Sequence, residues 1–174
     1  VLKPYQHENE QFGHVPDFPV DNQVYFDPQN RPFICTSDGI ATVTDGRWTT
    51  ADSRRSVRSA EGGGERDSYR LYGTKLAFDR DGGVYVLGTS GRHAALLHST
   101  DGGRTWRNPR TVISDGQDFF DDKEAIAADP TDARYVYVTW DRLARTGGGP
   151  SWFARTSDGG ASWEPARPIL DPGT

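Results

Sequence analysis

The chain has 174 residues, enough for one domain with a hydrophobic core, and its 20 Gly and 11 Pro residues are typical of short strands joined by turns. A net charge of -5 disfavours nucleic-acid binding, which requires a basic surface. No apolar run approaches the roughly 18 residues of a membrane span, so neither nucleic acid nor membrane is an expected partner. The chain contains no methionine, which leads us to expect a processed chain or a fragment.

The first repeat is expected at about residues 20–60, after an N-terminal extension over residues 1–19. It opens with an apolar run that ends in an aspartate turn at Asp27, and a β-rich run over Pro32–Cys35 follows. Cys35 is the only cysteine, which excludes an intrachain disulfide, and its apolar neighbours predict a buried side chain. The repeat continues to a short turn sequence over Asp45–Trp48.

Two further repeats follow, and each predicts four strands. In the second repeat, at about residues 74–114, we expect strands near 75–78, 84–88, 94–98 and 110–114. In the third, at about residues 123–170, we expect them near 125–128, 135–140, 152–155 and 166–170. Asp79 and Asp129 follow the first strand of these repeats, as Asp27 does in the first. The common order of motifs indicates one antiparallel four-stranded unit repeated about three times.

A second motif lies between the third and fourth predicted strands of each repeat. Two complete copies are present, and a shortened copy occurs in the first repeat. In this pattern an Asp carboxylate accepts hydrogen bonds from backbone N–H groups a few residues on, Gly permits positive φ, and Trp offers a large apolar face. This turn chemistry explains the aspartates without a catalytic role. The residues concerned are Asp45, Trp48, Ser99, Asp101, Gly103, Trp106, Thr156, Asp158, Gly160 and Trp163.

Radial repetition of four-stranded antiparallel sheets predicts an all-β fold, a β-propeller of about three blades. A solenoid is the alternative, but its repeats are usually shorter and helical or single-stranded. Three blades do not close a ring, and an open half would leave strand edges and blade faces uncovered. We therefore expect further blades from additional chain, from another chain or from self-association.

The segments Ser99–Trp106 and Thr156–Trp163 resemble the Asp-box, or BNR, repeat of sialidases and their relatives, and Asp122–Pro130 resembles the blade opening of many bacterial BNR-repeat proteins. The resemblance covers roughly residues 20–170 and implies half of a six-bladed sialidase-like propeller. Similar boxes occur in sialidases, xyloglucan-cleaving glycosidases, sorting receptors and noncatalytic propellers. The blades lack the Arg-Ile-Pro segment of active sialidases, and residues 88–95 lack the expected Asp, so they do not support sialidase activity.

A functional site is expected at the end of the sheets opposite the aspartate turns, because that end carries the long, variable loops. We predict loops at residues 36–39, 89–93 and 141–151 and connectors at 51–73 and 115–123. Carboxylates and cations there suit an anionic sugar or acid–base chemistry on a glycosidic bond. The alternative for residues 122–124 is an ordinary ion-paired strand entry. The candidates are Asp38, Arg92, His93, Asp122, Lys123, Glu124, Asp141 and Arg142.

Three functions remain open from the sequence: a sialidase-like glycan-active propeller, which as an enzyme would be an exo-sialidase-like glycoside hydrolase; a noncatalytic propeller that binds a glycan or a protein; and a structural or assembly fragment. A glycan is the expected ligand, and no cofactor is expected. No metal site is expected either, because His7, Glu8, Glu10 and His14 lack a recognised ligand spacing. We expect an extracellular or periplasmic location.

Overall fold

The computed structural model describes residues 8–9, 13–14, 19–36, 39–51, 72–89, 93–105, 107–114 and 118–170. The described residues are all-β and contain no helix. A small two-stranded sheet near the N-terminus pairs β1 (Glu8–Asn9) with β2 (Gly13–His14). The predicted Asp38 and Arg92, and the tryptophan at position 106, lie outside the described residues.

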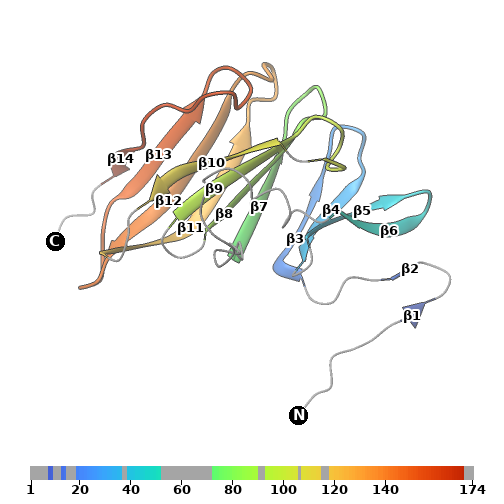
Figure 1. Cartoon of the computed structure of the whole chain (residues 1–174), viewed down its shortest axis with the longest axis horizontal. Helices are drawn as coiled ribbons and strands as arrows, with labels where there is room; N and C mark the ends of the chain where they lie inside the picture. Colours follow the sequence, from blue (N-terminus) through green and yellow to red (C-terminus); the bar gives the residue numbers. More distant parts are fainter. Residues whose placement is uncertain are drawn as a thin grey trace, which may run out of the picture.

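Three four-stranded antiparallel sheets make up the rest of the structure, as the sequence predicts (Figure 1). The first contains β3 (Pro19–Phe26), β4 (Pro32–Thr36), β5 (Gly39–Thr44) and β6 (Arg47–Ala51). The second contains β7 (Tyr72–Phe78), β8 (Val84–Thr89), β9 (His93–Ser99) and β10 (Arg107–Ser114). The third contains β11 (Phe119–Ala128), β12 (Val136–Ala144), β13 (Ser151–Thr156) and β14 (Arg167–Leu170).

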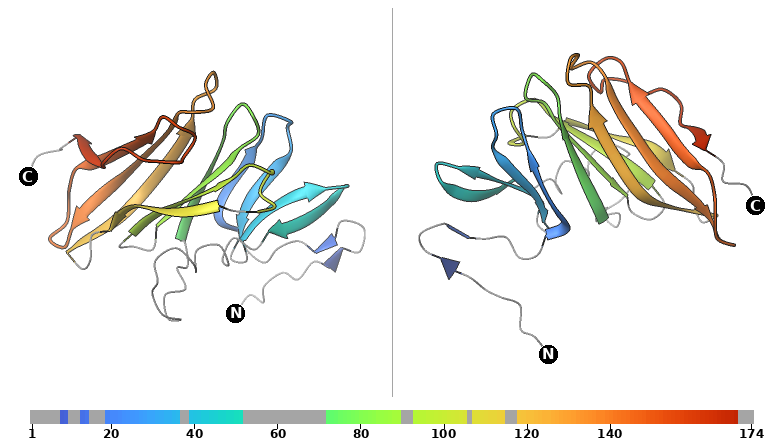
Figure 2. Two further views of the ribbon diagram at one scale, coloured as in Figure 1. Left: turned by 45° about the horizontal axis from the view of Figure 1, so that its top comes forward. Right: turned by 180° about the vertical axis from the view of Figure 1, so that it is seen from behind.

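Within each sheet the strands are paired in chain order, so each sheet is a meander. The sheets follow one another side by side, and their first strands adjoin: β3 contacts β7, and β11 contacts β7 and β8 (Figure 2). This is the relation between consecutive blades of a β-propeller, whose first strands lie nearest the central axis.

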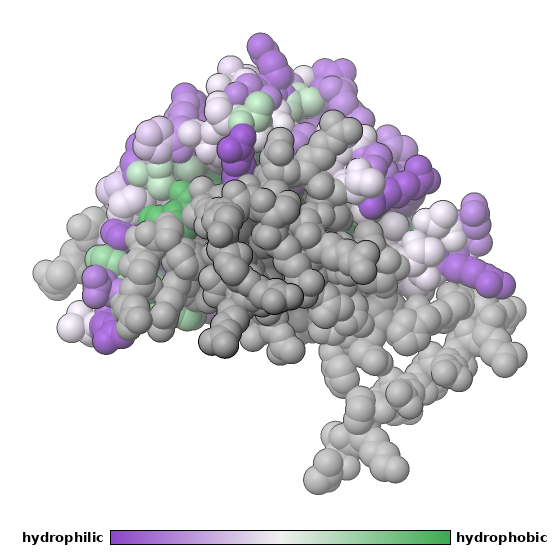
Figure 3. Space-filling view, viewed as in Figure 1, coloured by the Kyte–Doolittle hydropathy of each residue, from purple (hydrophilic) through white to green (hydrophobic). Residues whose placement is uncertain are grey.

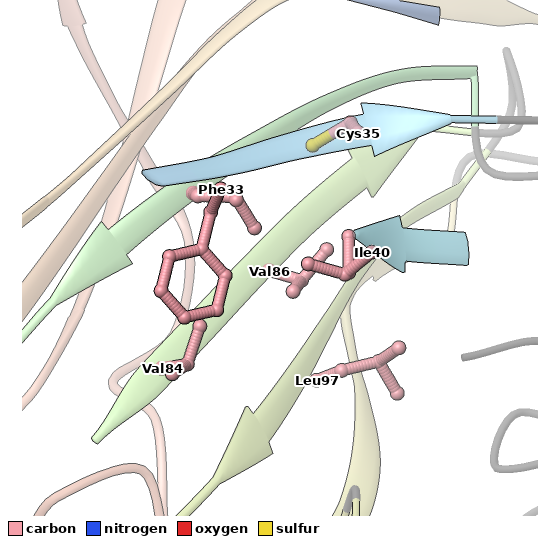
Figure 4. Packing of buried hydrophobic residues seen from close by; sticks show 7 residues of the cluster. Phe33, Cys35, Ile40, Val84, Val86 and Leu97 are labelled. Carbon is pink, nitrogen blue, oxygen red and sulfur yellow. The ribbon is translucent and has the colours of Figure 1, made fainter. Parts of the chain in front are cut away.

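The hydrophobic core consists of two layers, one on each face of the second sheet. Val84, Val86 and Leu97 pack against the first sheet, where they meet Phe33 and Ile40 (Figure 4). The intervening Tyr85, Leu87 and Leu96 pack against the third sheet. Because side chains alternate between the faces of a strand, the continuous apolar run over 84–87 is explained by burial on both faces.

The aspartate turns lie at the same end of each sheet, which we call the turn end. In Figure 1 the turns of the second and third sheets are at the top and the β5–β6 turn of the first sheet points to the right, and hydrophilic side chains gather over the upper end in Figure 3. Asp27 Oδ1 accepts the N–H of Arg31 at 2.7 Å, and Asp79 Oδ1 accepts that of Gly83 at 2.8 Å. A Cβ at Gly83 would collide with the Asp79 carboxylate, so glycine is required for this turn to close. The opposite, or loop, end carries the hairpin at 145–150.

Asp45, Asp101 and Asp158 lie in the turn between the third and fourth strands of the first, second and third sheets, respectively. The first copy nevertheless differs in geometry. Thr44 pairs directly with Arg47, so Asp45 and Gly46 form a two-residue turn with φ values of 52° and 74°. Two positive φ values give a turn whose twist matches a tight β-hairpin. The shortened sequence therefore forms a tighter turn than the complete copies do.

The predicted boundaries at the loop end of the third sheet were wrong. Residues 119–123 were expected in a connector and 141–144 in a loop, but β11 begins at Phe119 and β12 continues to Ala144. The pairing continues because a β-bulge after Asp122 inserts extra backbone into β11, with Lys123 at a φ of 56°. The bulge allows a strand where a charged sequence indicated a loop.

Candidate functional site

The structure brings five of the eight predicted site residues together at the loop end of the third sheet. Asp122, Lys123 and Glu124 lie on β11, while Asp141 and Arg142 lie on the adjacent β12. Asp122 is directly opposite Asp141 in the register. His93 begins β9 in the second sheet, and its side chain is not among those described.

The β-bulge explains why two carboxylates are buried here. Asp121 is 0% exposed and Glu124 is 5% exposed, although residues three apart would face opposite sides of a regular strand. The register shift between Asp122 and Ala125 resets the alternation. β11 therefore presents both side chains to the interior, next to the contacts that it makes with β7 and β8.

An inner cluster faces the second sheet and consists of Phe119, Asp121, Arg142 and Trp152. Asp121 is opposite Arg142 in the register, so both lie on one face of the sheet. The guanidinium carbon of Arg142 lies 3.7 Å from the centre of the Phe119 ring and 4.7 Å from that of the Trp152 ring. Cation–π attraction on both sides thus fixes the end of β12 between two aromatic rings.

An outer acidic surface lies on the other face and consists of Phe120, Asp122, Asp141 and Ser151. Ser151 Oγ donates a hydrogen bond to Asp141 Oδ1 at 2.7 Å, and Lys123 Nζ lies 3.2 Å from Asp122 Oδ2. The Phe120 residue is 52% exposed. Like charges directly opposite each other destabilise a sheet, so the Asp122–Asp141 pair has a cost that the fold itself does not require.

At the turn end, the carboxylates of Asp101 and Asp158 accept hydrogen bonds from residues of their own turns. Ser99 Oγ donates to Asp101 Oδ1 and accepts the N–H of Gly103, both at 2.8 Å, while Thr105 N–H donates to Asp101 Oδ1 at 2.8 Å. The third sheet repeats this pattern with Thr156, Asp158 and Ser162: the corresponding distances are 2.7, 2.9 and 2.9 Å. The predicted turn hydrogen bonds are therefore present in both copies.

These hydrogen bonds change the acidity of the turn aspartates. Burial alone raises the pKa of Asp101, but hydrogen bonds from Thr105, Ser99 and the backbone together lower that pKa to about 2. For Asp158, hydrogen bonds from Ser162 and then Thr156 lower the pKa to about 2. Both groups are kept ionised as structural acceptors, which leaves them unsuited to donate a proton in catalysis.

Tryptophans support the turns unequally. Trp163 packs against the core between the second and third sheets, next to the third-sheet turn. Trp48, which follows the tight turn of the first sheet, is half-buried. The predicted packing role is therefore observed for Trp163, while position 106 lies outside the described residues.

Sequence reasoning did not single out the aromatic residues of the site. Phe119, Phe120 and Trp152 were absent from the candidates. The sequence Phe-Phe-Asp-Asp over residues 119–122 was the available signal, because a strand with that sequence places one aromatic and one acidic residue on each face.

No group of three His, Cys, Asp or Glu side chains within the described ranges could hold a metal ion. The acidic residues of the loop end therefore do not form a metal cluster. A search of the described part of the chain for a helix long and apolar enough to cross a membrane finds none.

No protein-family model matches the chain, and no curated protein matches it. Among solved structures, it is similar to a GH74 xyloglucanase from Xanthomonas campestris, with 18% sequence identity and a TM-score of 0.47. The match covers 90% of this chain and 20% of the xyloglucanase, so the chain spans about a fifth of that structure's length. A likeness at this level of identity concerns the fold alone.

Proposed function

We propose that this chain is part of a carbohydrate-active β-propeller that binds a glycan at the loop end of its third sheet. The outer acidic surface carries the proposal. It combines an exposed aromatic ring at Phe120 with two carboxylates, Asp122 and Asp141, contributed by neighbouring strands. Carboxylates accept hydrogen bonds from sugar hydroxyls, and an aromatic ring covers the apolar face of a sugar ring.

The Asp122–Asp141 pair also supports a hydrolytic reaction. Directly opposite residues of an antiparallel pair lie on the same face of the sheet, so the Asp122 and Asp141 carboxyl groups are neighbours. Glycosidases that act through a covalent intermediate hold their two carboxyl groups about 5–5.5 Å apart. In this proposal one carboxylate attacks the anomeric carbon while the other, protonated carboxyl group gives its proton to the leaving oxygen. Water then hydrolyses the glycosyl–enzyme ester, and the second group takes back a proton from that water.

The charge of the surface favours neutral glycans over sialosides. The outer acidic surface carries two carboxylates, of which Asp122 forms an ion pair with Lys123. Arg142 is on the opposite face, between two aromatic rings. An anionic sugar would therefore approach like charge, so the proposed activity is that of a glycoside hydrolase on a neutral substrate rather than of an exo-sialidase.

The test compares glycan binding and sugar release between the wild-type chain and the Asp122→Asn, Asp141→Asn double variant. Because a hydrogen bond to a charged group contributes about 1.5–3 kcal/mol, affinity should fall by about 10- to 100-fold. Phe120→Ala should also weaken binding. The matched control is Glu164→Gln, which removes an exposed carboxylate of the same sheet that pairs with Arg155, and it should bind as the wild type does.

A panel of neutral polysaccharides and sialosides separates the alternatives. Binding without sugar release would identify a noncatalytic glycan-binding propeller. Equal affinity of the wild type and the double variant would contradict the assignment of the outer acidic surface.

A further inference from the structure

A second concave feature lies between the first and second sheets at the turn end, far along the strands from the outer acidic surface. It is a cavity of about 320 Å³, which falls at the lower end of the range for small-ligand sites. Phe33 and Ile40 of the first sheet form its apolar side, and Gly102 and Gly103 of the second-sheet turn lie across from them. Figure 4 shows Phe33 and Ile40 projecting toward the second sheet.

The repeat explains why a cavity exists at this interface. Between the second and third sheets, the rings of Tyr85 and His98 are stacked 4.2 Å apart, and Gly160 of the third-sheet turn packs against both of them. Tyr85 Oη also donates to the carbonyl of Gly159 at 3.3 Å. An aromatic pair thus fills the space beneath that turn.

The equivalent pair in the first sheet has a much smaller member. Phe33 of β4 pairs with Thr42 of β5, just as Tyr85 of β8 pairs with His98 of β9. Phe33 and Tyr85 are each the second residue of their strand. Thr42 therefore stands where the second sheet has an imidazole ring. The Phe33 ring contacts the tilted Phe78 ring, with ring centres 4.9 Å apart, and the Arg31 guanidinium, which lies 5.8 Å from the ring centre. Thr42 lines the cavity that results.

Three threonine hydroxyls provide hydrogen-bond acceptors along one side of this cavity. Thr42 Oγ1 donates to the Pro32 carbonyl at 2.9 Å, and Thr49 Oγ1 donates to the Thr42 carbonyl at 3.3 Å. The Thr44 and Thr49 hydroxyls are 3.3 Å apart, and with the Thr49 proton already used, Thr44 is the donor of that pair. All three oxygens consequently retain lone pairs that can accept hydrogen bonds from ligand hydroxyls.

Two guanidinium groups provide the donors. Arg31 Nε is bonded to the buried Asp27 at 2.6 Å, which holds the side chain in place. Its terminal nitrogens lie beside Gly102, where Nη2 would be 3.1 Å from an added Cβ. Arg104 is exposed at the rim. The described residues that line the cavity include no acidic side chain.

We infer that this cavity binds a small polyhydroxylated anion of monosaccharide size, such as a sugar carboxylate or a sugar phosphate. The guanidinium groups of Arg31 and Arg104 bind the anionic group, because charge-assisted hydrogen bonds to carboxylate and phosphate suit their geometry. The threonine oxygens accept hydrogen bonds from the ring hydroxyls, and the buried Phe33 and Ile40 form the apolar floor of the cavity beneath the ligand. This site does not depend on the glycan surface of the third sheet.

Isothermal titration calorimetry with glucuronate, glucose 6-phosphate and glucose tests the inference on the wild-type chain. The two anions should bind, and neutral glucose should bind at least about tenfold more weakly, since it lacks the partner of the guanidinium groups. The anion that binds with the higher affinity identifies the ligand as a carboxylate or a phosphate. No heat from either anion, or equal affinity for glucose, would overturn the inference.

Two variants locate the binding site. Thr42→His copies the residue that fills the other interface and should abolish anion binding. Arg104→Ala should reduce it by about tenfold or more. The control is Arg47→Ala, an exposed arginine of the same hairpin outside the cavity lining, which should bind anions as the wild type does. If Thr42→His does not fold, the anion affinities of Arg104→Ala and Arg47→Ala are compared instead. Equal affinities of those two variants would overturn the inference.

Discussion

The two ends of the third sheet use carboxylates in opposite ways. At the turn end, Asp158 takes its hydrogen bonds from Thr156 and Ser162, which belong to the same turn. At the loop end, Asp122 and Asp141 come from different strands and face each other across the sheet. An aspartate whose partners are all local is explained by folding, whereas an opposed pair that costs stability is better explained by a ligand.

This difference predicts that substitutions of the turn aspartates change stability and that substitutions of the opposed aspartates change glycan binding. The largest effect on stability is expected for Asp79→Ala. The Asp79 carboxylate is buried and accepts the N–H groups of Asp81 and Gly83 at 2.9 and 2.8 Å. Removing it leaves a buried donor without its partner, so the free energy of unfolding should fall by about 3 kcal/mol.

The matched control for this prediction is Asp129→Ala, at the equivalent turn of the third sheet. Asp129 bonds to Thr131 in an exposed turn, where water can replace the carboxylate, so the free energy of unfolding should fall by less than about 1 kcal/mol. Urea denaturation of both variants measures the difference. Equal losses would show that burial of the turn aspartate does not determine its contribution.

A slightly smaller loss of stability is expected for Gly149→Ala at the loop end. A Cβ there would collide with the carbonyl oxygen of Arg142 and lie 3.2 Å from Leu143 Cα, so the backbone of the hairpin must move. The free energy of unfolding should fall by about 2–3 kcal/mol. Glycan affinity should fall as well, because the same backbone carries Asp141.

Gly148→Ala is the control for this clash. Its φ of 73° is unfavourable for alanine, but no atom lies within 4 Å of the added Cβ. It should therefore cost about 1–2 kcal/mol of unfolding free energy and leave glycan affinity unchanged. Loss of binding in both variants would mean that hairpin strain of any kind, rather than displacement of Asp141, disrupts the surface.

The smallest effect is the acid dependence of the turn end. Hydrogen bonds lower the pKa of Asp101 and Asp158 from 3.8 to about 2. Because the pKa in the folded state lies below that in the unfolded state, the stabilisation is present above about pH 4 and is lost as the pH falls toward 2. The double variant Asp101→Asn, Asp158→Asn should show a smaller decrease in melting temperature between pH 5 and pH 2.

Thermal melts of the wild type and this variant over the same pH range provide the measurement. The variant should be less stable at pH 5 and approach the wild type at pH 2. A difference in melting temperature between the wild type and the variant that stays constant from pH 5 to pH 2 would contradict the role of the two ionised carboxylates in the turns.

Local chemistry made the repeated sheets predictable, since aspartate, glycine and a hydroxyl residue at fixed offsets specify a turn whatever surrounds it. The loop end was less predictable for two reasons. The bulge at Lys123 depends on a positive φ in a residue that is not glycine, which the sequence does not signal. The burial of Asp121 depends on the neighbouring second sheet, which no pattern within β11 reveals.

The cavity between the first two sheets shows a further limit. The exchange of His98 for Thr42 between equivalent positions becomes visible only when the strand registers are known. Spacing in the sequence alone aligns the turns, but it does not align the residues that pack beneath them.

Mapping of glycan contacts by backbone amide chemical shifts tests the central claim most directly, namely that the glycan binds at the loop end of the third sheet. The glycan with the highest affinity is titrated into the labelled chain. The amides of residues 119–124 and 141–151 should shift, while those of residues 157–163 should not. Shifts confined to residues 157–163, with the loop end unchanged, would contradict it.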